Sequence, residues 1–320
     1  MIKQANELTF GDKKFSMILY GAPGVGKTTL ALSAPNPVLI DFDKGVSRVK
    51  AYHRRLTIVC DTYEEVLNDI QAPEIKDCET IIIDTGGSFV SYLQDYVMRE
   101  NPAVNKQKNG AISLKGFGAV KQEFQRFTNM VRDVMNKNVI YVFHSDEQKD
   151  KDGNPQQRLL CEGAARNIVW QPCDFGGYVQ MISNTRVVTF TPTQEFFAKG
   201  CYGIEGQFNV PSIGPADKNE FLTNLFEKAR ANIEADNEAF APLKEQYDAA
   251  MIEVRKILDN IKTVDDANAA VASLPSLNHA LTSKKEASAL LSEKAKELGF
   301  AWDKTSKGYI VPAAESVGAN

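Results

Sequence analysis

The feature that most constrains this chain is the segment GAPGVGKT at residues 21–28, which matches the phosphate-binding pattern G-x-x-x-x-G-K-[ST]. The apolar run 15–20 precedes it and residues 29–32 follow, so the context indicates strand, glycine-rich turn and helix start. Glycines allow backbone amides to turn around a polyphosphate, where a helix N-terminus adds positive charge. Lys27 is expected at the β- and γ-phosphates and the Thr28 hydroxyl at Mg²⁺. The predicted phosphate-binding residues are Gly21, Ala22, Pro23, Gly24, Val25, Gly26, Lys27, Thr28 and Thr29.

Length and composition set the outer limits. A chain of 320 residues has room for two domains, which we expect over residues 1–214 and 215–320. Without a long apolar run or a signal-peptide core, the sequence predicts a cytoplasmic protein that does not enter membranes. Five cysteines without a C-x-x-C pair suit reduced thiols, and three scattered histidines do not indicate a metal cage. A net charge of −4 means that any nucleic-acid site must be local.

Past the phosphate loop, apolar runs alternate with helical patterns. The predicted strands are residues 37–42, 56–60, 80–84 and 139–143, and the predicted helices are 62–71, 89–99 and 119–137. Thr62 and Glu65 form a capping-box pattern at the start of the first of these helices. Strands that alternate with helices pair in parallel through right-handed crossovers and carry ligands at their carboxyl ends. The sequence therefore predicts an α/β fold with a mostly parallel central sheet.

Two acids and a histidine stand at the ends of these strands. Asp43 comes just after the strand at 37–42, Asp84 ends the strand at 80–84, and His144 follows the last strand. An acidic strand end beside a phosphate loop is where P-loop enzymes hold the carboxylate that positions Mg²⁺. We therefore predict that Asp84 serves the Mg²⁺ together with Thr28.

One polar stretch between two predicted helices carries positive charge without acids. Residues 101–118 contain Lys106, Lys108 and Lys115 together with Phe117. A basic loop with one aromatic ring suits single-stranded DNA, because cations follow the backbone while a base stacks on the ring. A solvated loop between helices explains the same composition, so both interpretations stay open.

The strand pattern changes after residue 175. Residues 178–183 and 186–191 alternate between apolar and polar side chains around a turn. They predict antiparallel strands that extend the sheet, with a third strand at 196–199. The helix-forming patterns of the earlier part of the chain are missing here.

The remainder of the chain is predicted to be helical. Proline and glycine in residues 211–215 mark a break, and Pro242 is expected to separate two helices beyond it. Further helices are predicted from Thr263 and over 283–298. Residues 299–310 are expected to form a small hairpin.

Several of these segments resemble the RecA-like ATPases, over about residues 15–190. Leu39-Ile40-Asp41-Phe42-Asp43 resembles the RecA strand that ends in a catalytic glutamate, with Asp43 at the position of that glutamate. Ile81-Ile82-Ile83-Asp84 followed by Thr85 resembles the RecA Walker B segment. Because Asp43 is one methylene shorter than Glu, the resemblance implies a water-activating base that sits closer to its water.

Three later segments continue the resemblance. Residues 139–144 resemble the strand whose end carries a sensor of the γ-phosphate, usually Gln in RecA, with His144 here. Residues 145–160 stand where RecA has a mobile DNA-binding loop. Gly163-Ala164-Ala165-Arg166 stands where RecA has a glycine and a basic residue that reaches the nucleotide of the neighbouring subunit.

In outline the chain is similar to the short phage RecA-like proteins, the phage nucleotide-binding or AAA-type ATPases, some of which act in single-strand annealing recombination. The resemblance implies a RecA-like P-loop NTPase core, while the predicted α-helical C-terminal region lies outside it and inherits nothing from it. It also implies ATP and Mg²⁺ as cofactors, single-stranded DNA as partner, a homo-oligomer and, for a phage protein, the cytoplasm of a bacterial host. The implied catalytic residues are Lys27, Asp43, Asp84, His144 and Arg166.

Two other functions stay open. A nucleotide-gated adaptor or loader with little hydrolysis would use the helices of the C-terminal region to hold a partner such as a single-strand-binding protein or a helicase. A small-molecule P-loop kinase is disfavoured, because such enzymes usually close an arginine-rich lid over the acceptor. The segment after residues 139–144 is not rich in arginine.

Overall fold

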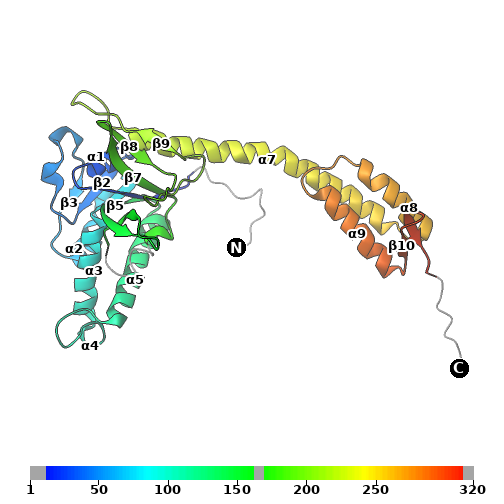
Figure 1. Cartoon of the computed structure of the whole chain (residues 1–320), viewed down its shortest axis with the longest axis horizontal. Helices are drawn as coiled ribbons and strands as arrows, with labels where there is room; N and C mark the ends of the chain where they lie inside the picture. Colours follow the sequence, from blue (N-terminus) through cyan, green and yellow to red (C-terminus); the bar gives the residue numbers. More distant parts are fainter. Residues whose placement is uncertain (1–11, 162–168, 313–320) are drawn as a thin grey trace. The chain divides into compact units, whose positions relative to one another are not determined.

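The computed structural model describes residues 12–161 and 169–312 of the chain (Figure 1). The chain divides into two compact units, one ending at Ile233 and the other beginning at Glu234. Within the described ranges, no helix is both long and apolar enough to cross a bilayer. Each unit has its own core, and the two are considered separately.

The first unit is built on a nine-stranded sheet. Eight of its strands follow the order β3-β2-β4-β5-β1-β7-β8-β9, and the ninth, β6, pairs with β5. Its strands are β1 (Ser16–Gly21), β2 (Pro37–Asp41), β3 (Thr57–Ile58), β4 (Thr80–Asp84), β5 (Asn138–Lys149), β6 (Pro155–Leu159), β7 (Phe175–Ile182), β8 (Thr185–Thr189) and β9 (Gln207–Asn209). The strands from β3 to β7 pair in parallel, and β6, β8 and β9 pair with their neighbours antiparallel. The predicted α/β fold with a mostly parallel sheet and an antiparallel extension is confirmed.

Helices cover both faces of this sheet. They are α1 (Lys27–Ala31), α2 (Tyr63–Asp69), α3 (Gly86–Glu100), α4 (Pro102–Asn105), α5 (Leu114–Asn129), the π-helical turn η5 (Met130–Val134), the 3₁₀ turns η2 (Val46–Arg48), η3 (Ala51–His53) and η4 (Pro73–Ile75), and α7 (Phe221–Asp259). In β4, Ile81 and Ile83 join the cluster formed with α2, α3 and α5, while Ile82 joins the cluster that includes Leu30 and Phe226. Successive strand side chains point to opposite faces, so an all-apolar strand fills two cores at once.

Several predicted elements are confirmed. Strands occupy 37–41 and 80–84, and the Thr62–Glu65 capping box opens α2, with the Thr62 side chain accepting from the Glu65 backbone amide. The strands β7 and β8 pair antiparallel and form the expected hairpin.

The segment 145–160, expected from the resemblance to be a mobile loop, is instead a β-hairpin. β5 continues past His144 to Lys149, and its last residues pair antiparallel with β6. The turn is closed by Asp150, whose carboxylate accepts from the backbone amides of Asp152 and Asn154. Gly153 takes a φ of +87°, a conformation that glycine adopts without strain. The part of β5 that forms this hairpin, residues 145–149, is polar throughout, so the alternation that marks a half-buried strand is missing there.

The antiparallel hairpin of β7 and β8 joins the rest of the sheet through β7, which runs parallel to β1. One other expectation about strands is wrong. The third strand of the extension is β9 and not residues 196–199, where Phe196 and Lys199 each make a single isolated bridge. Phe196 bridges to Gln157 on β6, and Lys199 bridges to Gly176 on β7.

Half of the predicted loop at 101–118 is helical. It contains α4, and α5 begins at Leu114 with Ser113 as its N-cap, whose hydroxyl accepts from the Gly116 amide. Lys115 and Phe117 therefore lie in the first turn of a helix. A serine cap three residues before Gly116 is the local signal that sets this helix start.

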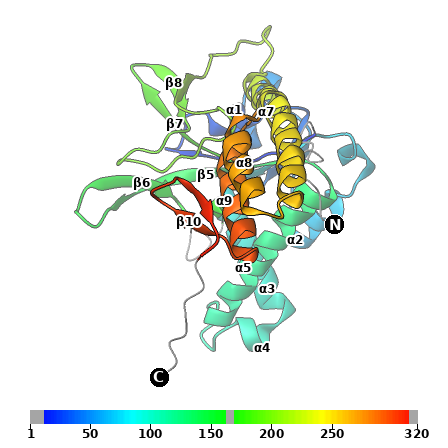
Figure 2. The same ribbon diagram turned by 90° about the vertical axis from the view of Figure 1, so that its right-hand side faces the viewer.

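The second unit contains the C-terminal part of α7, followed by α8 (Val264–Ser273), the 3₁₀ turn η6 (Leu274–Ser276), α9 (Ser283–Glu297) and the hairpin β10 (Ala301–Asp303) and β11 (Gly308–Ile310) (Figure 2). Val254, Ala267 and Leu291 belong to its core. The predicted helix at 283–298 and the hairpin are confirmed. Pro242 does not separate two helices, because it lies inside the continuous α7. Proline removes one backbone hydrogen bond there without ending the helix.

The ring of Phe89 provides a test of this packing. Phe89 is fully buried on α3 and its ring contacts those of Phe42, Phe124 and Phe127. We expect Phe89→Ala to lower the free energy of unfolding by about 3–5 kcal/mol, because it removes a large side chain and leaves a cavity. Urea denaturation followed by circular dichroism measures this. The matched control is Leu114→Ala, at a residue 90% exposed, and equal losses in the two variants would contradict the assignment.

Candidate nucleotide-binding site

The phosphate loop connects β1 to α1. Gly24 and Gly26 have φ values of +80° and +87°, which only glycine adopts at low cost. Gly26 is the N-cap of α1, so the first turn of the helix begins directly at Lys27. A short apolar strand, two left-handed glycines and a helix start therefore turn the backbone amides of the loop toward one place.

Strand order brings the other site residues to this loop. β5 lies between β1 and β4, and its register pairs Gly21 with His144 and Asp84 with Val142. β2 follows on the other side of β4, with Asp41 opposite Asp84. The carboxyl ends of four parallel strands thus meet at one edge of the sheet.

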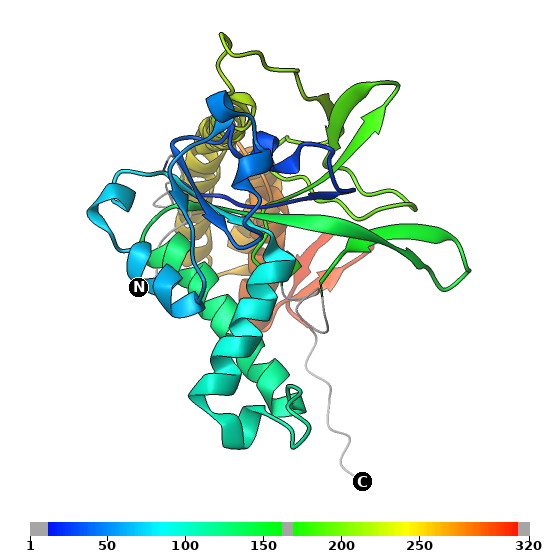
Figure 3. The same ribbon diagram turned by 90° about the vertical axis from the view of Figure 1, so that its left-hand side faces the viewer.

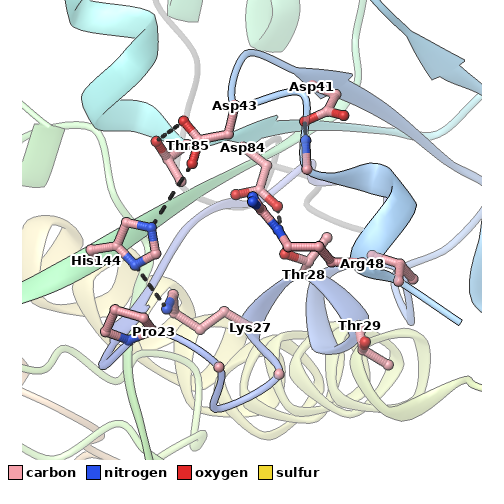
Figure 4. A pocket seen from close by; sticks show the side chains of 14 residues that line it. Pro23, Lys27, Thr28, Thr29, Asp41, Asp43, Arg48, Asp84, Thr85 and His144 are labelled. Atoms are coloured by element: carbon pink, nitrogen blue, oxygen red, sulfur yellow. Dashed lines mark hydrogen bonds and ion pairs between the residues drawn. The ribbon is translucent and has the colours of Figure 1, made fainter.

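A pocket of about 460 Å³ opens at this edge, within the size range of small-ligand sites (Figure 4). Of the predicted loop residues, Pro23, Gly24, Gly26, Lys27, Thr28 and Thr29 line it. Gly21, Ala22 and Val25 instead support the loop through their carbonyl groups, which accept hydrogen bonds from Lys27 or Arg186. The loop side of the pocket is therefore the segment expected from the sequence.

Lys27 is buried at the base of the pocket. Its Nζ donates to the carbonyl oxygens of Gly21 (3.0 Å) and Ala22 (2.8 Å) and lies 3.4 Å from Nδ1 of His144. Burial lowers the pKa of Lys27 to about 8, although the nearby carboxylates of Asp84 and Asp43 oppose this shift. A bound polyphosphate would add negative charge and favour the protonated amine.

A second hydrogen bond in the pocket joins the side chains of Thr28 and Asp84. The Thr28 hydroxyl donates to Oδ2 of Asp84 at 2.6 Å. Burial raises the pKa of Asp84, and the neighbouring carboxylates of Asp43 and Asp41 raise it further. A divalent cation would offset this crowding of negative charge.

The donor set fits Mg²⁺ bound together with a nucleotide. Within the described residues, no group of three or more His, Cys, Asp or Glu side chains forms a cage for a metal ion. Mg²⁺ needs no such cage, since it usually binds through one or two carboxylates, water and substrate phosphates. The Thr28 hydroxyl and the Asp84 carboxylate are the oxygen groups in this pocket that would hold such an ion.

Asp43 lies opposite the loop, in a network of hydroxyl groups. Its Oδ1 accepts from the Thr85 hydroxyl at 3.2 Å and from the hydroxyl of Ser88, both at the start of α3. Its Oδ2 lies 3.9 Å from Nε2 of His144. The pKa of Asp43 is held at about 2, first by His144 and then by Ser88 and Thr85. The carboxylate is therefore ionised and well satisfied.

His144 lies between the two charged groups of the site. Its Nδ1 faces Lys27 and its Nε2 faces Asp43, as the dashed lines in Figure 4 show. The five predicted residues Lys27, Thr28, Asp43, Asp84 and His144 are brought together around one pocket. His144 therefore lies between the lysine of the phosphate loop and the Asp43 carboxylate.

One predicted residue, Arg166, lies outside the described residues. Lys106, Lys108, Lys115 and Phe117 lie at the end of the α3–α5 hairpin near α4, and none of them lines the pocket (Figure 1).

Sequence reasoning missed several residues of the site. Asp41 accepts from the backbone amides of Gly45 (2.9 Å) and Val46 (2.8 Å) and so fixes the turn that carries Asp43. Arg48, two residues further along, lines the pocket. The signal available for Asp41 was its place at the end of a fully apolar strand, where a buried carboxylate needs partners.

Arg186 is a missed residue that acts on the loop from a distance in sequence. It lies on β8, and its Nε donates to the carbonyl oxygen of Val25 at 2.6 Å. A Cβ atom at Gly26 would come within 2.6 Å of its guanidinium group. No local pattern marks Arg186, because its contact exists only after β7 and β8 have joined the sheet.

The fold and the site together define a P-loop nucleotide-binding core. A family model described as an AAA domain matches residues 13–202, which is more than half of the chain. The protein therefore belongs to this AAA-domain family, whose members in general bind ATP with Mg²⁺ and act as ATPases. No curated protein matches the sequence.

The contact of Arg186 with the loop is open to a direct test. We expect Arg186→Ala to weaken ATP binding by about tenfold, because a charge-assisted hydrogen bond that holds Val25 is lost. Titration with a fluorescent ATP analogue measures the dissociation constant. Arg132→Ala, which removes an arginine bonded to Asp133 beside it, is the control. Equal affinities in the two variants would show that the loop keeps its shape without Arg186.

Proposed function

We propose that this protein is a Mg²⁺-dependent ATPase whose nucleotide state controls its binding to single-stranded DNA. The observation that carries the ATPase part is the convergence of Lys27, the Thr28–Asp84 pair, Asp43 and His144 on one pocket beneath a phosphate loop. Hydrolysis of a phosphoanhydride needs placement and charge stabilisation more than covalent chemistry from the protein. The pocket offers both.

Each side chain has a role that its position supports. Lys27 neutralises the β- and γ-phosphates, while the amides of the loop hold them in place. The Thr28 hydroxyl and the Asp84 carboxylate, which are hydrogen-bonded to each other, would hold a Mg²⁺ ion that enters with the nucleotide. When bound, Mg²⁺ neutralises charge on the phosphates.

We assign the two remaining roles to Asp43 and His144, which lie beside each other in the pocket. Asp43 orients the attacking water and accepts its proton, and His144 hydrogen-bonds to the γ-phosphate and reports its presence to Asp43. His144 is suited to this role because it already touches both Lys27 and Asp43.

One observation favours the second candidate, a nucleotide-gated adaptor with little hydrolysis. Asp43 accepts from two hydroxyl groups and has a pKa of about 2, so it is a weak base in this arrangement. An enzyme of this kind would turn over slowly, or only after a partner releases Asp43 from Thr85 and Ser88. The helices of the C-terminal unit would then hold the partner, such as a single-strand-binding protein or a helicase.

The biological setting follows from the resemblance to short phage RecA-like proteins. We propose a role in phage DNA recombination by single-strand annealing, or in replication, carried out by a homo-oligomer. In such an assembly Arg166 would reach the nucleotide of a neighbouring subunit. Lys106, Lys108, Lys115 and Phe117 remain the DNA contacts that the sequence suggested.

The first test is ATP hydrolysis with Mg²⁺, measured with and without single-stranded DNA. We expect Lys27→Ala to reduce turnover by at least about 10²-fold, because it removes the cation at the transferring phosphate. Circular dichroism and thermal unfolding show whether the fold is intact. Lys121→Ala, at an exposed lysine on α5, serves as the matched control. Unchanged turnover in a folded Lys27→Ala protein would refute the ATPase assignment.

Asp43 separates the two candidate functions. If it activates water, Asp43→Asn lowers kcat by about 10²–10⁴-fold and leaves nucleotide affinity nearly unchanged, and Asp43→Glu retains activity. Steady-state kinetics with a parallel binding titration give both quantities. If wild-type turnover is negligible and Asp43→Asn changes nothing, the nucleotide-gated adaptor is the correct assignment.

A further inference from the structure

The segment that joins β2 to β3 is rich in positive charge beyond Asp43, its one carboxylate. Residues 44–56 contain five Lys or Arg residues and no Asp or Glu, in a protein whose net charge is −4. These cations are Lys44, Arg48, Lys50, Arg54 and Arg55. The segment folds into the two 3₁₀ turns η2 and η3, drawn in blue on the side that faces the viewer in Figure 3.

Most of this charge is not neutralised. Lys44 pairs with Asp61. The other four cations are exposed, and none of them makes an ion pair with a carboxylate of the described residues. We call residues 48–55, which carry these four cations, the basic surface.

Backbone carbonyl groups hold two of these side chains in place. Arg54 donates to the carbonyl oxygens of Val49 and Ser47, both at 2.9 Å, and Arg55 donates to that of Tyr52 at 3.3 Å. Such bonds order a guanidinium group and leave its positive charge available. A preorganised cation loses less entropy when an anion binds.

An aromatic ring stands among these cations. Tyr52 is 36% exposed, its hydroxyl lies 3.4 Å from the carbonyl oxygen of Ile213, and Nζ of Lys50 lies 5.8 Å from the ring centroid. His53 beneath it is buried, with its ring centroid 4.4 Å from that of Tyr52. Burial lowers the pKa of His53, and Arg55 and Lys50 lower it further, as expected in a region of positive potential.

The basic surface is continuous with the nucleotide pocket. Gly45, Arg48 and Val49 line that pocket, and Figure 4 shows Arg48 on the same side of it as Thr28 and Thr29. Asp41 fixes the start of the segment by accepting from the amides of Gly45 and Val46. Ligands in the pocket and on the basic surface would therefore contact the same short segment.

We propose that the basic surface binds single-stranded DNA and is the place where nucleotide state and DNA binding meet. This inference rests on the proposed function for its ligand and adds the location. Unpaired cations attract the phosphates, and the exposed ring of Tyr52 accepts a base, which must be unpaired to stack on it. An acidic surface on a second copy of the chain would match the cations but would give Tyr52 no stacking partner.

The test uses the full-length protein with ATP and Mg²⁺ and a fluorescent oligothymidylate of about 20 nucleotides. Lys50→Gln/Arg55→Gln removes two charges that do not line the pocket. Lys284→Gln/Lys285→Gln removes two adjacent exposed charges from α9 and is the matched control. Anisotropy titrations from about 50 to 200 mM salt give the affinity and its salt dependence.

We expect the Lys50/Arg55 variant to bind at least about fivefold more weakly than the wild type. The negative slope of log K against log salt should become shallower by about 1.4, since each of the two lost single-strand phosphate contacts contributes about 0.7. The control retains the wild-type values. Tyr52→Ala is expected to lose about tenfold in affinity with an unchanged slope, because stacking carries no charge, while Tyr52→Phe keeps its affinity. Basal ATP hydrolysis stays unchanged in all four variants.

The outcomes separate this inference from the proposed function. If the wild-type protein does not bind the oligonucleotide, the DNA part of the proposed function fails, and this inference fails with it. If the wild type binds and the Lys50/Arg55 variant binds equally well, the inference alone is overturned. Loss of self-association in sedimentation, without loss of DNA binding, would overturn it in favour of a contact between copies of the chain.

Discussion

The parallel pairing of β1 with β5 is the interaction on which the site depends. It places His144 directly beside Gly21, at the first residue of the phosphate loop. Because β4 pairs with the other edge of β5, the same alignment sets the distance from Asp84 to Thr28. A shift of one residue would turn every side chain of β5 to the opposite face. Tyr141 and Phe143 pack in one cluster and Ile140 and Val142 in the other, so the shift would exchange aromatic rings for smaller side chains in both. Core packing therefore also determines the geometry of the site.

The sequence predicted the parts of the site that depend on local structure. Strand ends, glycines and the Thr62 cap are encoded within a few residues, so the amino-acid pattern was enough to find the phosphate loop, Asp43, Asp84 and His144. It was not enough for the contacts made by Ser88 and Arg186, because they join segments far apart in the chain. The hairpin that continues β5 was missed for another reason. Its strands pair through backbone groups, and its polar side chains carry no pattern that predicts this pairing.

Two charged side chains of the site already have hydrogen-bond partners within the protein. Lys27 is bonded to carbonyl groups of its own loop and Asp43 to hydroxyl groups of α3, so both charges are satisfied before a ligand arrives. Satisfied charges stabilise the fold, but each must exchange a partner when a nucleotide binds. For Lys27 the phosphates offer a stronger partner than neutral carbonyl groups. Asp43 already has Thr85, Ser88 and His144 as partners, so the role that we propose for it requires the release of one of these contacts.

The bond from Arg186 to Val25 links the phosphate loop to the antiparallel end of the sheet. Arg186 keeps its position only while β8 remains paired with β7 and β9. Opening of this sheet edge would therefore loosen the loop, and a ligand that tightens the loop must in turn favour the closed edge. By thermodynamic linkage, part of the free energy of nucleotide binding stabilises strands that never touch the nucleotide. Through this one hydrogen bond, we expect the stability of the sheet edge to depend on whether the pocket is occupied.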